Sequence, residues 1–184
     1  RRRHTRLQGD WSSDVCSSDL KLGVFMKPII NVNDVNDFQE HKHESFEAKY
    51  ANISQKIGAE KLGYNITIVP PGKKSWPFHN HHVSEEMFII LDGEGTLRYG
   101  DEKYSVKKND IIACPVGDRS SAHQFINDSK SDLKYLALGT KTDHDICEYP
   151  DSDKVLARSN KNGDSLLWNM SKKKESYDYF EGEK

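Results

Sequence analysis

The sequence has no long hydrophobic run, few cysteines and no excess of charge of either sign. No stretch is long and apolar enough to span a bilayer, which takes about 20 residues. Three cysteines among 184 residues do not make a disulfide framework, and they favour reduced thiols in a cytoplasmic protein. The 27 basic and 29 acidic residues give a net charge of −2, which offers no electrostatic case for nucleic-acid binding. We therefore expect a cytoplasmic protein that binds neither membranes nor nucleic acids.

The first 20 residues differ in composition from the rest. They contain four arginines and the stretch Trp11-Ser-Ser-Asp-Val-Cys-Ser-Ser-Asp-Leu20, but not the apolar run that a signal peptide needs. The segment is similar to translated sequencing-adapter sequence, so we expect residues 1–20 to be a non-native, disordered leader. A disordered native tail is the alternative. Residues 21–25 fit either part, and Met26 is the expected start of a single domain spanning residues 26–184.

Short β-strand patterns recur at even spacing in the middle of the chain, with glycine or asparagine turn signals between them. They cover residues 64–69, 87–91, 96–99, 103–106, 110–115, 123–127 and 133–138. Many short strands of this kind predict a sandwich or a barrel. We expect a barrel core over about residues 60–140 and a C-terminal packing tail over 141–184. The segment 46–57 adds one or two N-terminal strands.

Three histidines and a glutamate stand out as candidate metal ligands. His79 and His81 are two residues apart, so on a strand both side chains lie on the same face. Glu86 precedes the strand pattern at 87–91, and His123 begins the pattern at 123–127. Three imidazoles and one carboxylate can hold a divalent metal and leave it open positions. The alternative is a set of buried polar residues without metal, which is costly for four unpaired groups.

The two blocks that carry these residues resemble the two conserved motifs of the cupin superfamily. The first matches in His79-x-His81, four residues, Glu86, six residues and Gly93. The second matches in Pro115-x-Gly117, then His123, and three residues to Asn127. There are three departures: one extra residue between Gly72 and His79, Asn109 in place of the first glycine of the second motif, and a longer loop between Gly117 and His123. Asparagine tolerates the positive φ that such a turn requires.

The resemblance extends over about residues 28–158, to small bacterial proteins with a single cupin domain. It implies an all-β fold, a cupin-type double-stranded β-helix (jelly-roll) barrel with irregular N- and C-terminal extensions. It also implies a divalent transition metal, Fe, Mn, Ni or Zn, bound by His79, His81, Glu86 and His123. Association into a homodimer is a further expectation, because cupins commonly associate through sheet edges.

Two classes of function stay open. The first is a metal-dependent enzyme that acts on a small polar or oxygen-chelating molecule, as a dioxygenase, a decarboxylase or an isomerase. The second is a non-catalytic protein that binds a sugar or an organic acid through the metal. The spacing identifies no general acid or base, so no catalytic residue is assigned.

Several other residues have weaker predictions. His82 and Glu85 alternate away from the ligands and are expected to face outward. His41 and His43 are expected in a surface loop, Cys114 in the core and Cys147 in a late loop. Trp76 and Phe78 fit either the pocket mouth or the core, and Arg119 is an exposed loop residue that could meet an anionic substrate. The predicted interior side chains are Phe88, Ile90, Leu97, Tyr99 and Phe125.

Overall fold

The structure, a computed structural model, describes residues 27–173 and 176–184. These residues form β-strands and two short 3-10 turns, which confirms the predicted all-β class. The predicted leader and the expected start at Met26 lie outside the described residues. No helix in the described part has the length and hydropathy that a membrane span requires.

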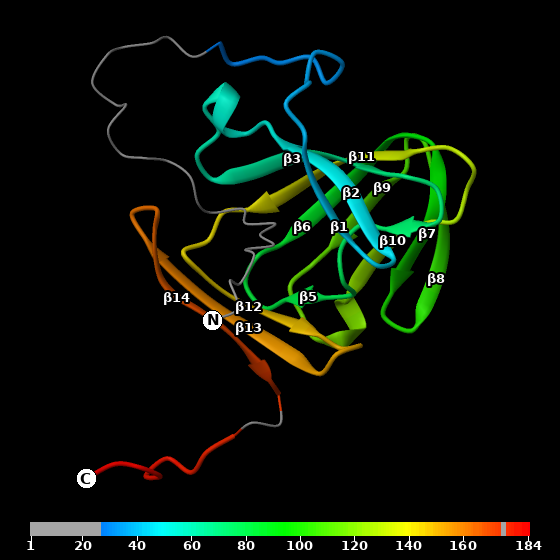
Figure 1. Cartoon of the computed structure of the whole chain (residues 1–184). Coiled ribbons are helices and arrows are strands. Elements are labelled where there is room, and N and C mark those ends of the chain that lie inside the picture. Colours follow the sequence, from blue (N-terminus) through cyan, green and yellow to red (C-terminus); the bar gives the residue numbers. More distant parts are fainter. Residues whose placement is uncertain (1–26, 174–175) are drawn as a thin grey trace.

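The described strands form two sheets (Figure 1). The strands are β1 (Gln39–His43), β2 (Phe46–Asn52), β3 (Leu62–Val69), β4 (Lys73–Lys74), β5 (Asn80–His81), β6 (Glu86–Asp92), β7 (Glu94–Tyr99), β8 (Glu102–Lys107), β9 (Ile111–Cys114), β10 (His123–Asn127), β11 (Leu133–Thr140), β12 (His144–Tyr149), β13 (Lys154–Lys161) and β14 (Asp164–Lys172). The larger sheet has the order β8-β7-β10-β4-β2-β3-β11-β6-β9, and β1 pairs with β2. The smaller sheet has the order β14-β13-β12-β5.

The larger sheet curls into a half-barrel, consistent with the double-stranded β-helix that the resemblance implied (Figure 1). Its strands alternate between buried and more exposed side chains, as β11 shows with Leu133, Tyr135 and Ala137 buried and the residues between them less so. This period of two puts one face of the sheet toward the interior. The predicted strand pattern at 133–138 is thereby confirmed as part of β11.

An aromatic cluster forms the core inside the half-barrel. Of the five predicted interior residues four are buried, and the fifth, Tyr99, is partly buried against them. The rings of Phe88 and Phe125 lie 4.9 Å apart, and those of Phe125 and Tyr135 lie 4.6 Å apart. Such pairs add about 0.5–1.5 kcal/mol beyond the burial of their area. The ring of Phe88 is also 5.4 Å from that of His123, so this cluster supports one of the candidate ligands.

Two positions of the cupin-like motifs, Gly93 and Asn109, lie in turns where the backbone has a positive φ. Gly93 has φ +80°, and a Cβ there would collide with the backbone carbonyl oxygen of Asp132. Asn109, which replaces a motif glycine, has φ +76°. The expectation that asparagine accepts a positive φ at this turn is confirmed.

The segment expected as a packing tail is more regular than predicted. It contains β12, β13 and β14, which form the smaller sheet together with β5. β13 and β14 are joined through Asn162 and Gly163, with φ values of +54° and +89°. Positive φ at both positions is typical of a type I′ hairpin turn, for which Asn-Gly is a strong signal. The hairpin of β13 and β14 is therefore encoded by a local Asn-Gly turn.

Candidate metal centre

The segment that carries His79 and His81 connects the two sheets. The backbone of His79 bonds to that of His123 in both directions, at N–O distances of 3.3 and 2.8 Å. Two residues later His81 pairs with Cys147 of β12, in the smaller sheet. These backbone pairings place His79 beside the larger sheet and His81 beside the smaller one.

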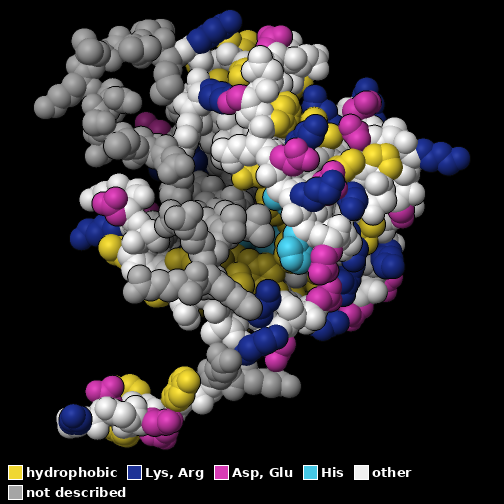
Figure 2. Space-filling view, in the orientation of Figure 1, with side chains coloured by type: hydrophobic (Ala, Val, Ile, Leu, Met, Phe, Trp, Pro, Cys, Tyr) yellow, Lys and Arg dark blue, Asp and Glu magenta, His cyan; other side chains and the backbone are white. Residues whose placement is uncertain are grey.

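The structure brings all four predicted residues together. His81 Nε2 lies 3.4 Å from Glu86 Oε2, and His123 Nε2 lies 3.0 Å from the same oxygen. The His79 ring centre is 5.1 Å from that of His81 and 4.7 Å from that of His123. One ligand atom each of His79, His81 and Glu86 fits within a 4.8 Å group. Figure 2 shows histidine side chains near the middle of the visible face, beside a hollow bordered by hydrophobic side chains.

Each imidazole is oriented by an oxygen next to its Nδ1 atom. The acceptors are the carbonyl of Pro77 at 2.7 Å for His79, the carboxylate of Asp145 at 2.6 Å for His81, and the carbonyl of Ser121 at 3.4 Å for His123. An oxygen accepts a hydrogen bond only from a protonated Nδ1, so in the neutral ring the Nε2 atom keeps its lone pair. The same arrangement orients histidines that bind metals.

Three of the converging atoms are buried without a hydrogen-bond partner among the described residues. They are His81 Nε2, Glu86 Oε2 and His123 Nε2. With both Nδ1 atoms protonated, two nitrogen lone pairs would face a carboxylate oxygen, and only a proton or a cation between them makes this arrangement favourable. A donor set of imidazole nitrogens and a carboxylate oxygen suits a divalent transition metal.

The charges at the centre shift the pKa values of its groups in opposite directions. Burial lowers the pKa of His79 to about 3, with the neighbouring charges of His123 and His81 acting in the same direction. Burial raises the pKa of the Glu86 carboxyl, but the charges of His81 and His123 outweigh it and hold the pKa at about 2. Burial also lowers the pKa of His81, yet Glu86 and Asp145 on its two sides raise it well above 6.5. Without a metal, the His81 imidazole is therefore protonated and lies between the carboxylates of Glu86 and Asp145.

Comparison with known proteins agrees with this geometry. A sequence model of the cupin domain matches residues 65–139, a range that contains all four candidate ligands. Residues 65–139 of the chain form a cupin domain. An uncharacterized protein of Methanocaldococcus jannaschii is 36% identical over 83 residues, which is 45% of this chain and 56% of the length of that relative.

Two solved structures share the cupin fold over most of both chains. One is a proposed sugar phosphate isomerase from Acidithiobacillus ferrooxidans, with a TM-score of 0.72, 24% identity, and coverage of 82% of this chain and 96% of that one. The other is a sugar phosphate isomerase of the cupin superfamily from Silicibacter pomeroyi, with a TM-score of 0.69, 20% identity, and coverage of 81% and 95%. At these identities the likeness shows the fold alone.

The smaller sheet contributes residues that sequence reasoning missed. Asp145 is fully buried and also accepts hydrogen bonds from the backbone N–H groups of Val83 and Ile146, at 3.1 and 2.9 Å. Cys147 was expected in a loop, but it lies in β12, is buried, and places its Sγ 3.2 Å from His81 Nδ1. The period-two spacing of positions 145, 147 and 149 was the signal for this strand face.

Tyr149 closes the same side of the centre. Its ring stacks on that of His79, with centres 6.0 Å apart and planes at 22°. Burial raises the pKa of its hydroxyl far above the ordinary value, and the neighbouring charges of Cys147 and Asp145 add to this effect. Its phenol therefore keeps the proton at neutral pH.

The remaining predicted residues lie away from the centre or serve the packing. His82 bonds to Glu148 at 2.9 Å, Glu85 is exposed, and Arg119 is an exposed residue 3.6 Å from Asp101. Cys114 is buried in the core as expected.

His41 and its aromatic neighbours correct one prediction. His41 is not in a surface loop: it lies in β1, bonds to the carbonyl of Ser75 at 2.8 Å and has its ring 4.2 Å from that of Trp76. His43 ends the same strand, so it too lies in a strand and not in a loop, and its side chain is exposed. Phe78 is buried beneath the guanidinium of Arg98, which lies 3.7 Å from the ring centre.

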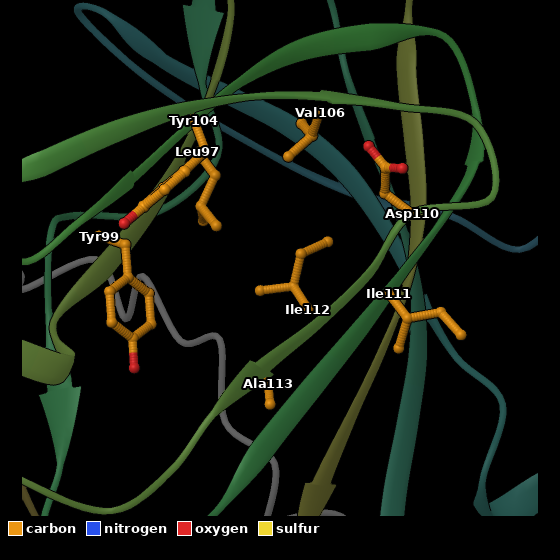
Figure 3. A pocket seen from close by; sticks show the side chains of 8 residues that line it. All are labelled: Leu97, Tyr99, Tyr104, Val106, Asp110, Ile111, Ile112 and Ala113. Atoms are coloured by element: carbon orange, nitrogen blue, oxygen red, sulfur yellow. The ribbon is translucent and has the colours of Figure 1, made fainter.

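A cavity of about 390 Å³ lies between β7, β8 and β9 (Figure 3). It is lined mainly by apolar side chains, among them Leu97, Val106 and Ile112, which point into it. None of its eight lining residues is a candidate ligand. Tyr99 in its wall pairs with His123 in the neighbouring strand β10.

Proposed function

We propose that this protein is a metal-dependent enzyme whose divalent transition metal is bound by His79, His81, Glu86 and His123. One observation supports this above the others: three buried donor atoms from different strands point at one another without hydrogen-bond partners among the described residues. Burial of unpaired polar atoms costs about 1–3 kcal/mol each, and a bound cation removes that cost.

The substrate proposed is a small polar molecule with two adjacent oxygens. Four protein ligands leave two positions of a six-coordinate metal for these oxygens. When bound, the metal supplies Lewis acidity, or oxygen chemistry if it is iron. The two solved structures named as sugar phosphate isomerases support the isomerase type, because an open-chain sugar has a carbonyl and a hydroxyl on adjacent carbons.

The residues of this chain then have distinct roles. Asp145 holds the proton on Nδ1 of His81 and would leave Nε2 free to bind a metal. Tyr149, beside His79, keeps its phenolic proton and would donate a hydrogen bond to an oxygen of a bound substrate. The buried aromatic cluster around Phe88, inside the half-barrel, excludes water from the side of the centre next to His123.

A second candidate function is a non-catalytic protein that binds a sugar or an organic acid through the metal. The two carboxylates at the centre favour this alternative. Glu86 and Asp145 both have lowered pKa values, and both are held between cationic or hydrogen-bonding neighbours. A carboxylate of this kind is a poor general acid or base near neutral pH.

Metal content tests the proposal. The full chain would be purified without chelators or a histidine tag and measured by elemental mass spectrometry, beside His79→Ala, His123→Ala and the control His82→Ala. We expect a near-stoichiometric metal in the wild type and in the His82 variant, and its loss in the other two. A wild type that binds no metal even after reconstitution with Fe, Mn, Ni or Zn would contradict both candidate functions.

A further inference from the structure

The side chain of Asn80 ties the first ligand segment to the second. It lies between His79 and His81, and its Nδ2 donates a hydrogen bond to the carbonyl oxygen of Gly117 at 2.8 Å. Gly117 belongs to the loop that leads to His123. Because successive side chains of an extended segment point to opposite faces, Asn80 faces away from the imidazoles on either side of it. It therefore contacts the second segment without being a ligand.

Gln124 makes the reciprocal contact. It follows His123 in β10, and its Nε2 donates a hydrogen bond to the carbonyl oxygen of Trp76 at 2.7 Å, in the segment that leads to His79. Asn80 and Gln124 are both buried, with 0% and 3% of their surfaces exposed. Each of these amides is the immediate neighbour of a candidate ligand, and each crosses to the segment that carries another.

The backbone contact between the two ligand segments is short. His79 and His123 form an isolated bridge with two hydrogen bonds, not part of a longer strand pair. One backbone hydrogen bond lies on either side of this bridge, from Gly117 N–H to the carbonyl of His81 and from Ser75 N–H to the carbonyl of Phe125. Rotation of one segment about so short a contact changes the distance between the imidazoles. Side-chain bonds on both sides of the bridge restrict that rotation.

The other end of the Asn80 amide indicates that this side chain does more than fill space. Its Oδ1 atom is buried without a hydrogen-bond partner among the described residues. A buried acceptor without a partner costs free energy, and an apolar side chain of similar shape would avoid that cost. What only the amide provides at this position is the hydrogen bond from Nδ2 to the loop before His123.

We propose that Asn80 and Gln124 are positioning residues, which fix His79 and His81 relative to His123 and thereby set the geometry of the bound metal. This inference rests on the proposed metal centre. The two contacts hold the ring centres of His79 and His123 4.7 Å apart. Contacts that orient ligands in this way change metal affinity although they do not touch the metal.

Titration with Co²⁺ tests the proposal, because the absorption spectrum of bound Co²⁺ depends on its coordination geometry. The full chain would be studied as wild type, Asn80→Leu and Gln124→Met, in which an apolar side chain of similar shape replaces the amide. The control Thr67→Val removes a buried hydrogen bond to Asn65 in β3, a strand without candidate ligands. We expect Co²⁺ affinity to fall about 10–100-fold in both amide variants, with an altered spectrum. The control should keep the affinity and the spectrum of the wild type.

Urea unfolding of the metal-free chains separates positioning from general stability. Thr67→Val should unfold at lower urea than the wild type, so a loss of affinity that came from instability alone would appear in this control too. Equal losses in the control and the amide variants would overturn the proposal. If one amide variant does not fold, the other, which lies on the opposite segment, decides.

The outcome for the wild type distinguishes this inference from the proposed function. A wild type that does not bind Co²⁺ would contradict the metal centre itself. A wild type that binds Co²⁺, beside amide variants with the same affinity and the same spectrum, would overturn only the role of Asn80 and Gln124.

Discussion

Asp145 and His81 come from different parts of the chain and are joined by a 2.6 Å hydrogen bond between the carboxylate and Nδ1. The carboxylate is fully buried and has a guanidinium nitrogen of Arg158 3.6 Å away. This contact connects the second sheet of the fold to the proposed metal centre, and several measurable properties depend on it.

Asp145→Asn should weaken metal binding. The amide oxygen can still accept the hydrogen bond from His81. Because the negative charge of the carboxylate is lost, the His81 imidazole becomes a weaker metal ligand. The expected loss of metal affinity is about 10–100-fold, measured by competition with a chromophoric chelator. Glu148→Gln is the matched control, because Glu148 contacts His82 and Lys173 instead. Equal affinity in the two variants would mean that Asp145 has only a structural role.

Metal binding should release a proton from His81. The pKa of His81 in the metal-free protein is raised, so the ring is protonated at pH 7, whereas His79 with a pKa of about 3 is already neutral. Ligation requires the neutral ring of His81, so metal affinity should decrease as pH falls. Calorimetry at pH 7 in buffers with different heats of ionisation should show release of about one proton. A binding enthalpy that is the same in all buffers would contradict this assignment.

The metal-free protein should be most stable in mildly acidic solution. The raised pKa of His81 gives stability that is complete below 6.5 and is lost as pH rises through the folded-state pKa. The lowered pKa of Glu86 gives stability that is complete above 4.5 and is lost as pH falls toward about 2. The lowered pKa of His79, about 3, makes the stability fall as pH drops below 6.5, because the unfolded chain then binds a proton that the folded chain does not. Urea unfolding in the presence of a chelator should therefore give its maximum free energy near pH 6.5. Added metal should stabilise the protein most on the alkaline side.

Gly93→Ala should destabilise the fold more than Gly72→Ala. Both glycines have positive φ, +80° and +74°, which costs an alanine about 1–2 kcal/mol. A Cβ at Gly93 also meets the backbone of Asp132, whereas a Cβ at Gly72 meets nothing within 4 Å. We expect a further loss of about 1–3 kcal/mol at Gly93, read as the difference in the free energy of unfolding in urea. Equal losses would show that the Asp132 segment moves away freely.

The sequence was sufficient to predict the barrel strands and the four converging residues. Alternation over two residues places His79 and His81 on one face, and this signal is local. That Glu86 and His123 lie beside them depends on how the strands pair, and this expectation came from the resemblance to the two cupin motifs.

Asp145 and Cys147 could not be assigned in the same way, because their role depends on β12 pairing with the two-residue strand β5. Nothing in the local pattern of β5 indicates a partner more than 60 residues further along the chain. The hairpin of β13 and β14 is a different case, because the dipeptide Asn162-Gly163 is itself a local signal for a two-residue hairpin turn. The predicted packing tail did not use this signal. His41 was misassigned because its burial comes from Trp76, a residue far from it in sequence.

The short segment from His79 to His81 is hydrogen-bonded to the larger sheet at one end and to the smaller sheet at the other. A cation bound by both imidazoles would therefore act as a clasp that fastens the smaller sheet to the larger one. Amide hydrogen exchange in β12 should slow when metal is added, although β12 supplies none of the proposed ligands. The exchange rate of the amides in the smaller sheet would then report directly on whether metal is bound at the centre.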